Sequence, residues 1–215
     1  MRISLLHTID GNKRVFDEAA KQLGLGDGDL RHEVRPDLRE AVQQAGAFSE
    51  DLKAQTARCV LDLAADSDAV IVSCATLGPV VDQLQDAAVP IVRADRALAA
   101  AAANGGGKIA VLCAVASTIE ANRRLFEEHI VIAGTLVEIV HVEPVWTLYQ
   151  SGDIAGSHAA AAAAADEAYE AGATVVAFAH PWMAPAASLV RAKQRPLHSA
   201  DAALRAVVKQ PAGGV

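Results

Sequence analysis

Two stretches of the sequence decide the fold: Val70-Ile71-Val72-Ser73-Cys74 and Val176-Ala177-Phe178-Ala179-His180, the second 106 residues after the first. Other segments keep the same offset. Residues 2–6 match residues 108–112, Pro90 matches Pro196, and residues 94–98 match residues 200–204. A shared offset across separate segments indicates two copies of one unit, each about half of the chain. It also places Cys74 and His180 at equivalent positions.

Each half reads as short apolar, β-branched runs that alternate with helical stretches. Such runs show little polar alternation, which is typical of parallel strands buried on both faces. The predicted strands are residues 3–7, 32–34, 69–73, 90–93, 109–113, 137–141, 175–179 and 196–198. The predicted helices are residues 13–23, 50–64, 78–86, 95–103, 118–129, 158–171, 184–193 and 201–209. This order predicts an α/β fold with parallel sheets, in which ligands bind beyond the carboxyl ends of the strands.

The composition narrows the classes of protein. A chain of 215 residues with 52% hydrophobic residues fits one domain or two small ones with a large core. Its net charge of −7 makes nucleic acid an improbable partner. No apolar stretch is long enough to span a bilayer, and the first residues lack the pattern of a signal peptide, so we expect no membrane partner and a cytoplasmic location. Three cysteines argue against a disulfide framework.

Several motifs are missing from the sequence. The seven histidines are scattered, and neither Cys-x-x-Cys nor His-Glu-x-x-His occurs, so we expect no metal site. There is no Gly-x-Ser-x-Gly for a serine hydrolase and no dinucleotide fingerprint. The glycine run at residues 104–108 follows a helix and precedes a strand. A phosphate loop needs the reverse order, so this run is interpreted as a helix C-cap and a linker between the two halves.

The strongest candidates for chemistry lie where a strand ends and a helix is predicted to begin. Cys74 has this position in the first half, where free backbone N–H groups and the helix dipole would stabilise a thiolate. His180 has it in the second half, and an imidazole can act as acid or base near neutral pH. Cys59 and Cys113 are expected to be structural.

Further residues at strand ends are candidates for substrate binding. Backbone amides and hydroxyls there can hold a carboxylate, although the hydroxyls could equally cap helices. His7 could also orient a partner rather than touch a ligand, and Trp182 could line a pocket or belong to the core. The candidates are His7, Thr8, Asn12, Ala75, Thr76, Ser117, Thr118, Pro181 and Trp182. The sequence does not assign roles to His32, Arg35, Trp146 and Tyr149, although an arginine such as Arg35 could clamp a carboxylate or form a surface ion pair.

With these residues in view, the chain resembles the aspartate/glutamate racemase superfamily, which includes amino-acid and hydantoin racemases, maleate isomerase and arylmalonate decarboxylase. The resemblance rests on residues 5–8, 68–79, 90–95, 148–153 and 175–185. It implies two pseudo-symmetric Rossmann-like lobes with parallel sheets and an active site in the cleft between them. Lobe 1 would be residues 1–98, joined by a C-terminal helix at 199–215, and lobe 2 residues 99–198. The resemblance also implies no cofactor, a small carboxylate substrate and a homodimer or higher homo-oligomer.

Racemases of this type place one cysteine at a strand end of each lobe. Cys74 matches the first cysteine, and His180 stands where the second would be. We therefore expect a cofactor-independent racemase or isomerase that transfers a proton between Cys74 and His180. One alternative is a non-catalytic carboxylate-binding protein of the same fold. Another is a maleate-isomerase-like enzyme with Cys74 as covalent nucleophile, and a third is a Cys–His hydrolase, which would need the two side chains ~3 Å apart.

Overall fold

The computed structural model describes residues 1–26 and 28–209 of the chain. The chain divides into two compact units. Unit 1 contains Met1–Ala97 and the segment that begins at Ala200, and unit 2 contains Leu98–Ser199. The junction falls inside helix α4 (Ala94–Ala103), so the glycine run at 104–108 is not the linker that we expected. Within the described residues, no helix combines the length and the apolar character needed to cross a bilayer.

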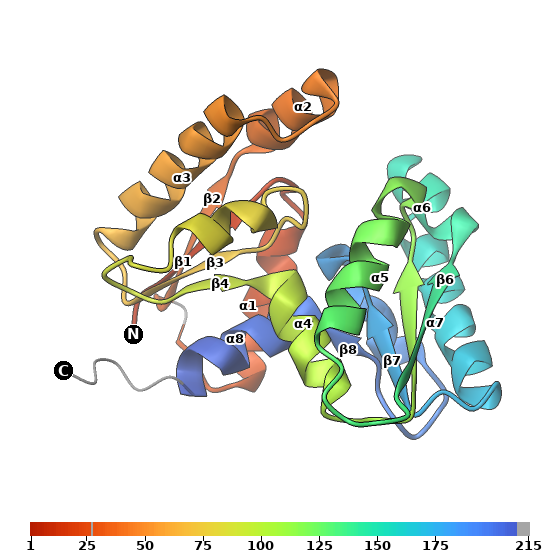
Figure 1. The fold of residues 1–215 in the computed structure, drawn as a ribbon. Helices are drawn as coiled ribbons and strands as arrows, with labels where there is room; N and C mark the ends of the chain where they lie inside the picture. Colours follow the sequence, from red (N-terminus) through yellow and green to blue (C-terminus); the bar gives the residue numbers. More distant parts are fainter. Residues whose placement is uncertain (27, 210–215) are drawn as a thin grey trace. The chain divides into compact units, whose positions relative to one another are not determined.

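Unit 1 is built on a four-stranded parallel sheet with the strand order β2-β1-β3-β4. Figure 1 shows α2 and α3 on one side of this sheet and α1 and α8 on the other. The strands are β1 (Ile3–His7), β2 (Leu30–Val34), β3 (Ala69–Val72) and β4 (Ile91–Arg93). The helices are α1 (Asn12–Gln22), α2 (Pro36–Ala45), α3 (Glu50–Ala64), the 3-10 helix η1 (Gly78–Gln83) and α8 (Ser199–Lys209).

Unit 2 repeats this topology with the strand order β6-β5-β7-β8, again all parallel. Helix α5 covers one side of the sheet, and α6 and α7 cover the other (Figure 1). The strands are β5 (Lys108–Cys113), β6 (Leu136–His141), β7 (Val175–Phe178) and β8 (Leu197–His198). The helices are α5 (Ile119–Glu128), α6 (Glu143–Gln150), α7 (Ile154–Glu170) and the 3-10 helices η2 (Ala116–Thr118) and η3 (Pro181–Leu189).

The central strands form the core of each unit. Every residue of β1 and β3 is buried, and so is all of β5 after its first residue. Helix α3 presents Val60 and Leu63, one turn apart, to Val70 and Val72 of β3 in a single apolar cluster. Burying side chains of this size stabilises the fold by about 1.5–3 kcal/mol each. The continuous apolar runs seen in the sequence are therefore strands covered on both faces.

All eight predicted strands are present, with ends that differ by no more than two residues. Two helices were not predicted, α2 and α6. Each begins with a proline in its first turn, which marks a helix start as readily as a loop. The helices predicted at 78–86 and 184–193 are instead the 3-10 helices η1 and η3. Pro185 lies inside η3 and has no N–H to donate to an α-helical bond.

The strand order fixes one special place in each sheet. In unit 1 the chain leaves β1 toward β2 on one side and returns as β3 on the other. In unit 2 it does the same around β5 and β7. Ligands of open α/β sheets bind at such switch points, beyond the carboxyl ends of the two strands. The residues that follow β1, β3, β5 and β7 are therefore candidates for contact with a ligand.

Candidate active site

Cys74 follows β3 by two residues and is half-buried. No α-helix follows Cys74: the residue opens a turn, and the helix predicted at 78–86 is the short 3-10 helix η1, which begins at Gly78. The carbonyl of Cys74 accepts hydrogen bonds from the backbone N–H of Leu77 (3.1 Å) and Gly78 (2.9 Å). The Cys74 side chain packs against the apolar cluster of unit 1. The expected stabilisation by an α-helix N-terminus is therefore wrong.

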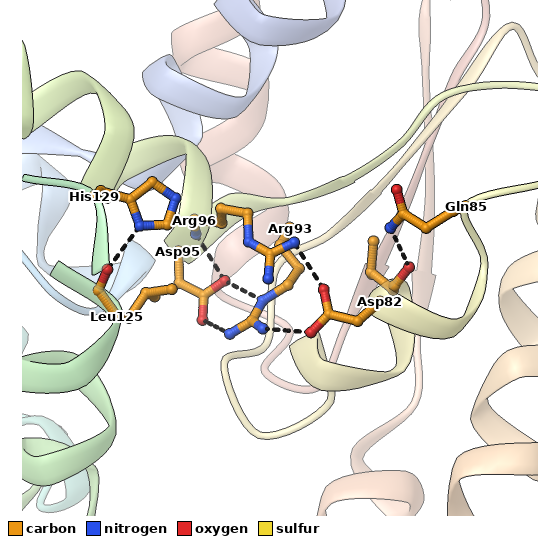
Figure 2. A network of polar contacts seen from close by, with 8 residues as sticks. Asp82, Gln85, Arg93, Asp95, Arg96, Leu125 and His129 are labelled. Atoms are coloured by element: carbon orange, nitrogen blue, oxygen red, sulfur yellow. Dashed lines mark hydrogen bonds and ion pairs between the residues drawn. The ribbon is translucent and has the colours of Figure 1, made fainter. Parts of the chain in front are cut away.

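Arg93 forms a network of ion pairs with Asp95 and Asp82, which Figure 2 shows. Arg93, from the end of β4, donates two hydrogen bonds to the carboxylate of Asp95 (3.0 and 2.8 Å) and a third to Asp82 (3.4 Å). Arg96 forms a second ion pair with Asp82 at 2.7 Å. A Cβ atom at Gly78 would lie 2.7 Å from Nε of Arg93, so the guanidinium fits only over a glycine. This network holds the turn after Cys74 in place.

His7 ends β1 and has no exposed surface. Its Nδ1 is 2.7 Å from the hydroxyl of Ser73, and its Nε2 is 2.9 Å from Nδ1 of His32. The other nitrogen of His32 is 2.9 Å from a carboxylate oxygen of Asp17, which completes a chain of four side chains. Burial, followed by the charges of His32 and Lys13, lowers the pKa of His7 to about 3, so this imidazole is neutral near pH 7. With both nitrogens engaged, His7 orients Ser73, the neighbour of Cys74, and has no ring nitrogen left for a ligand.

Two other candidates lie just after β1. Thr8 is buried, with 4% of its surface exposed. Asn12 is the first residue of α1, and its Oδ1 is buried without a hydrogen-bond partner among the described residues. A buried carbonyl oxygen without a donor costs about 1–3 kcal/mol, which a donor from a ligand would recover. Ala75 and Thr76 are half-buried in the turn after Cys74.

His180 follows β7 by two residues and precedes η3. Its Nε2 accepts a hydrogen bond from the backbone N–H of Val115 (3.3 Å) and lies 3.7 Å from Sγ of Cys113, the last residue of β5. Burial lowers the pKa of His180 to about 4, so this imidazole is also neutral near pH 7. Because Nε2 accepts from Val115, the neutral ring carries its proton on Nδ1.

A cluster of aromatic rings begins at His180. Its ring stacks on that of Trp182, with centroids 5.3 Å apart and planes at 7°. Trp182 is buried and also contacts Tyr149 (4.3 Å) and Trp146 (5.5 Å), both from α6. The stack fixes the plane of the imidazole. Trp146 and Tyr149, which the sequence left without a role, contact Trp182 in this cluster.

The remaining candidates of unit 2 differ in placement. Ser117 is exposed, and Pro181 is half-buried as the first residue of η3. Thr118 is the N-cap residue of α5, but its side chain makes no capping hydrogen bond. Its hydroxyl donates to the carbonyl of Val115 (2.8 Å) and lies 3.0 Å from Sγ of Cys113. This hydroxyl therefore belongs to the group around Cys113.

Arg35 directly follows β2, and its side chain is engaged in an ion pair. It precedes α2 and binds Asp37 through two hydrogen bonds of 2.8 and 2.7 Å, and this pairing raises the pKa of the guanidinium. Of the two fates considered for Arg35, the surface ion pair is therefore the one observed.

No protein-family model matches the sequence, and no curated protein matches it significantly. Solved structures do match. An aspartate racemase homologue from Pyrococcus horikoshii is 16% identical, with 97% of both chains covered and a TM-score of 0.70. An allantoin racemase from Klebsiella pneumoniae is 13% identical, with 97% of this chain and 86% of that chain covered (TM-score 0.68). A glutamate racemase from Bacillus anthracis is 16% identical, with 96% and 80% covered (TM-score 0.64).

The chain has the fold of these racemases. At this level of identity the likeness establishes the fold and leaves the chemistry to the residues of this chain.

Within this racemase fold, sequence reasoning missed residues that contact the candidates. Cys113 was assigned a structural role, yet its sulfur lies beside His180. Ser73, His32 and Asp17 were not grouped with His7. One signal could have identified Cys113: it stands 106 residues after His7, so the repeat pairs these two strand ends just as it pairs Cys74 with His180.

Proposed function

We propose that this chain is a cofactor-independent racemase or isomerase of a small carboxylate, an amino acid or a related acid, that works by proton transfer between Cys74 and His180. One observation carries the proposal. The thiol and the imidazole each follow the third strand of their own unit, at the switch point of two sheets with the same strand order. Both residues therefore occupy the position at which this type of sheet binds ligands.

The two groups would divide the work between them. One removes the proton from the α-carbon, and the other returns a proton to the opposite face of the same carbon. Burial lowers the pKa of His180, so the imidazole begins the cycle neutral near pH 7. Backbone amides and hydroxyls at Ala75, Thr76, Ser117 and Thr118 would hold the carboxylate and stabilise the negative charge that develops on it.

Asn12 supports a substrate that carries an N–H group. Its buried Oδ1 has no donor among the described residues, and an ammonium or amide N–H of a ligand would supply one. A simple unsaturated diacid has no such donor. This observation favours an amino acid over the substrate of a maleate-isomerase-like enzyme.

The test is exchange of the α-proton in heavy water. Wild type and Cys74→Ala are incubated with the separate enantiomers of aspartate and glutamate, two carboxylates for which structurally similar racemases are named. Proton NMR follows loss of the α-proton, and chiral chromatography follows inversion. We expect wild type to exchange and invert at least one probe and Cys74→Ala to be slower by about 10³-fold. Cys59→Ala serves as the control, because it removes a thiol from the middle of α3.

Other outcomes would contradict the proposal. Equal exchange by wild type and Cys74→Ala would exclude the thiol. Binding of a probe without exchange or inversion would favour the carboxylate-binding alternative. Isomerisation of maleate with a covalent adduct on Cys74, detected by mass spectrometry, would favour the covalent route.

A further inference from the structure

A chain of polar side chains connects the surface of unit 1 to the end of β3. Nε2 of His32 lies 2.9 Å from a carboxylate oxygen of Asp17, whose side chain is 48% exposed. Nδ1 of His32 lies 2.9 Å from Nε2 of His7. Nδ1 of His7 is 2.7 Å from the hydroxyl of Ser73, which is buried. The chain therefore runs from solvent to the residue that precedes Cys74.

The carboxylate of Asp17 fixes the direction of every hydrogen bond in this chain. A carboxylate only accepts, so a neutral His32 carries its proton on Nε2, and its Nδ1 accepts. His7 must then donate from Nε2, which leaves Nδ1 of its neutral ring as the acceptor for the Ser73 hydroxyl. In this direction the oxygen of Ser73 accepts no hydrogen bond from the described residues.

The same contacts support the opposite direction once His32 has taken up a proton. A charged imidazole donates from both nitrogens, here to Asp17 and to Nε2 of His7. His7 then carries its own proton on Nδ1 and donates to Ser73, whose hydroxyl proton turns to the carbonyl of Leu6 at 3.2 Å. One proton from solvent has been added, and all three contacts of the chain are kept. The oxygen of Ser73, however, now accepts a hydrogen bond.

Unit 2 builds the same strand order without this chain. The ladders place Cys113 where His7 ends β1, Ile139 where His32 lies in β2, and Ala179 where Ser73 follows β3. Two of these three residues have no polar side chain. The fold therefore does not require the chain, which belongs to the strand ends of unit 1 alone.

We propose that Asp17 and His32 are positioning residues which, through His7, keep the oxygen of Ser73 free as an acceptor at the end of β3, and that protonation of His32 removes this acceptor. The inference rests on the proposed function, because a free acceptor there suits the N–H donors of an amino-acid substrate. It adds a control by pH that neither Cys74 nor His180 supplies.

The surroundings direct the added proton to His32 rather than to His7. His7 has no exposed surface, and burial, followed by the charges of His32 and Lys13, lowers its pKa to about 3. The side chain of His32 is 13% exposed and lies against the carboxylate of Asp17, which favours a positive charge on the ring. The charged groups of the elements around the two rings are Asp17, Lys13 and Lys21 of α1, Asp10 before it, and Arg31 and Glu33 of β2.

The first measurement follows the histidine rings by nitrogen-15 NMR and needs no turnover, with His7→Gln and His32→Gln to assign the resonances. At pH 8 we expect a neutral His7 with its proton on Nε2. As His32 gains its charge on titration to pH 5.5, His7 should stay neutral while its proton moves to Nδ1 with the same midpoint. The inference is overturned if His7 keeps its proton on Nε2 throughout, carries it on Nδ1 at pH 8, or becomes charged together with His32.

Asp17→Asn tests whether the carboxylate sets the direction. A carboxamide can accept from Nε2 of His32 or donate to it, so at pH 8 His7 should become a mixture of its two tautomers. Glu18→Gln is the matched control, because it removes the next carboxylate of α1, which pairs with Arg14. This control should leave the proton of His7 on Nε2. An unmixed Nε2 tautomer in Asp17→Asn, or the same mixture in both variants, would overturn the role of Asp17.

The third measurement links the chain to the proposed reaction. In wild type, inversion of an exchanged probe should fall by about two- to tenfold between pH 8 and pH 5.5, the effect of one lost hydrogen bond, with the midpoint that NMR gives for His32. His32→Gln keeps a hydrogen-bonding side chain but does not titrate, so this fall should be absent. The same fall in His32→Gln would overturn the link to the reaction. If wild type exchanges no probe, the proposed function fails, and the two NMR measurements still decide whether the chain reverses.

Discussion

The two units have the same strand order, but a thiol and an imidazole occupy opposite strand positions in them. In unit 1 an imidazole ends the first strand and a thiol follows the third, as His7 and Cys74. In unit 2 the thiol ends the first strand and the imidazole follows the third, as Cys113 and His180. In both units the first-strand group is completely buried, and the group after the third strand retains some exposure.

This difference teaches that the strand position, rather than the residue type, sets the role of each group. The end of the first strand lies between two paired neighbours and is covered, so its side chain can only support others. The position after the third strand lies beyond the last ladder bond, where the chain turns away from the sheet. A group there can reach a ligand. We therefore expect the same substitution to change the rate of inversion by different amounts at His7 and at His180.

The largest effect should come from His180→Gln compared with His7→Gln. If His180 transfers a proton as proposed, His180→Gln should lower inversion by about 10²–10³-fold with little change in folding. His7→Gln should lower inversion by less than about 10-fold, because His7 acts only through Ser73. Rates of inversion and circular dichroism melts of both variants give the measurement. Equal losses of inversion in the two variants would remove the distinction between the two strand positions.

Acid should weaken both units through the same two histidines. The pKa is lowered to about 3 for His7 and to about 4 for His180, mainly by burial, whereas an unfolded histidine titrates near 6.5. Below pH 6.5 the unfolded chain therefore binds protons that the folded chain does not, and the free energy of unfolding falls as the pH falls toward 4. Each histidine accounts for up to about 3 kcal/mol.

Urea denaturation of wild type, His7→Gln and His180→Gln at pH 7 and pH 4.5 measures this effect. Each variant should lose less stability than wild type between the two pH values, whatever its stability at pH 7. A variant with the same pH slope as wild type would mean that its histidine is protonated in the folded state.

Gly78 distinguishes the units by packing. A Cβ at Gly78 would press on Arg93, which its ion pairs hold in place, whereas the residue 106 positions later in unit 2 is Ala184. Gly78→Ala should therefore cost about 1–3 kcal/mol by overpacking and displace the turn after Cys74. Thermal melts test this, with Gly28→Ala as control, because a Cβ there meets no atom within 4 Å. Equal melting temperatures for the two variants would show that the Arg93 side chain moves aside without a loss of stability.

The smallest effect is expected at Arg35 in unit 1 and His141, its counterpart in unit 2. Arg35 pairs with Asp37 at the surface, and His141 is exposed. Arg35→Gln should change stability by less than about 1 kcal/mol. Neither Arg35→Gln nor His141→Gln should alter the KM for an exchanged substrate by more than about twofold. A larger rise in KM for Arg35→Gln would restore the carboxylate clamp that the sequence had left open.

Much of the fold could be predicted because its signals are local. Buried parallel strands have short apolar runs in their sequence, and all eight strands lie at the runs that predicted them. Helices α2 and α6 were not predicted, because each has a proline in its first turn and few buried apolar residues. The state of the segment after Cys74 was missed for a related reason: the sequence shows that a turn begins, but not whether an α-helix or a 3-10 helix follows it.

By itself, the sequence determined the duplicated succession of strands and helices and the equivalence of Cys74 and His180, because a repeat and a strand need only neighbouring residues to be recognised. The order of the strands in each sheet came from the structure. The tertiary structure alone decided which groups touch them. His7 meets Ser73 across 66 residues, and Cys113 meets His180 across 67. Parallel strands pair only after a long crossover, so the side chains that touch at their carboxyl ends are always far apart in the chain.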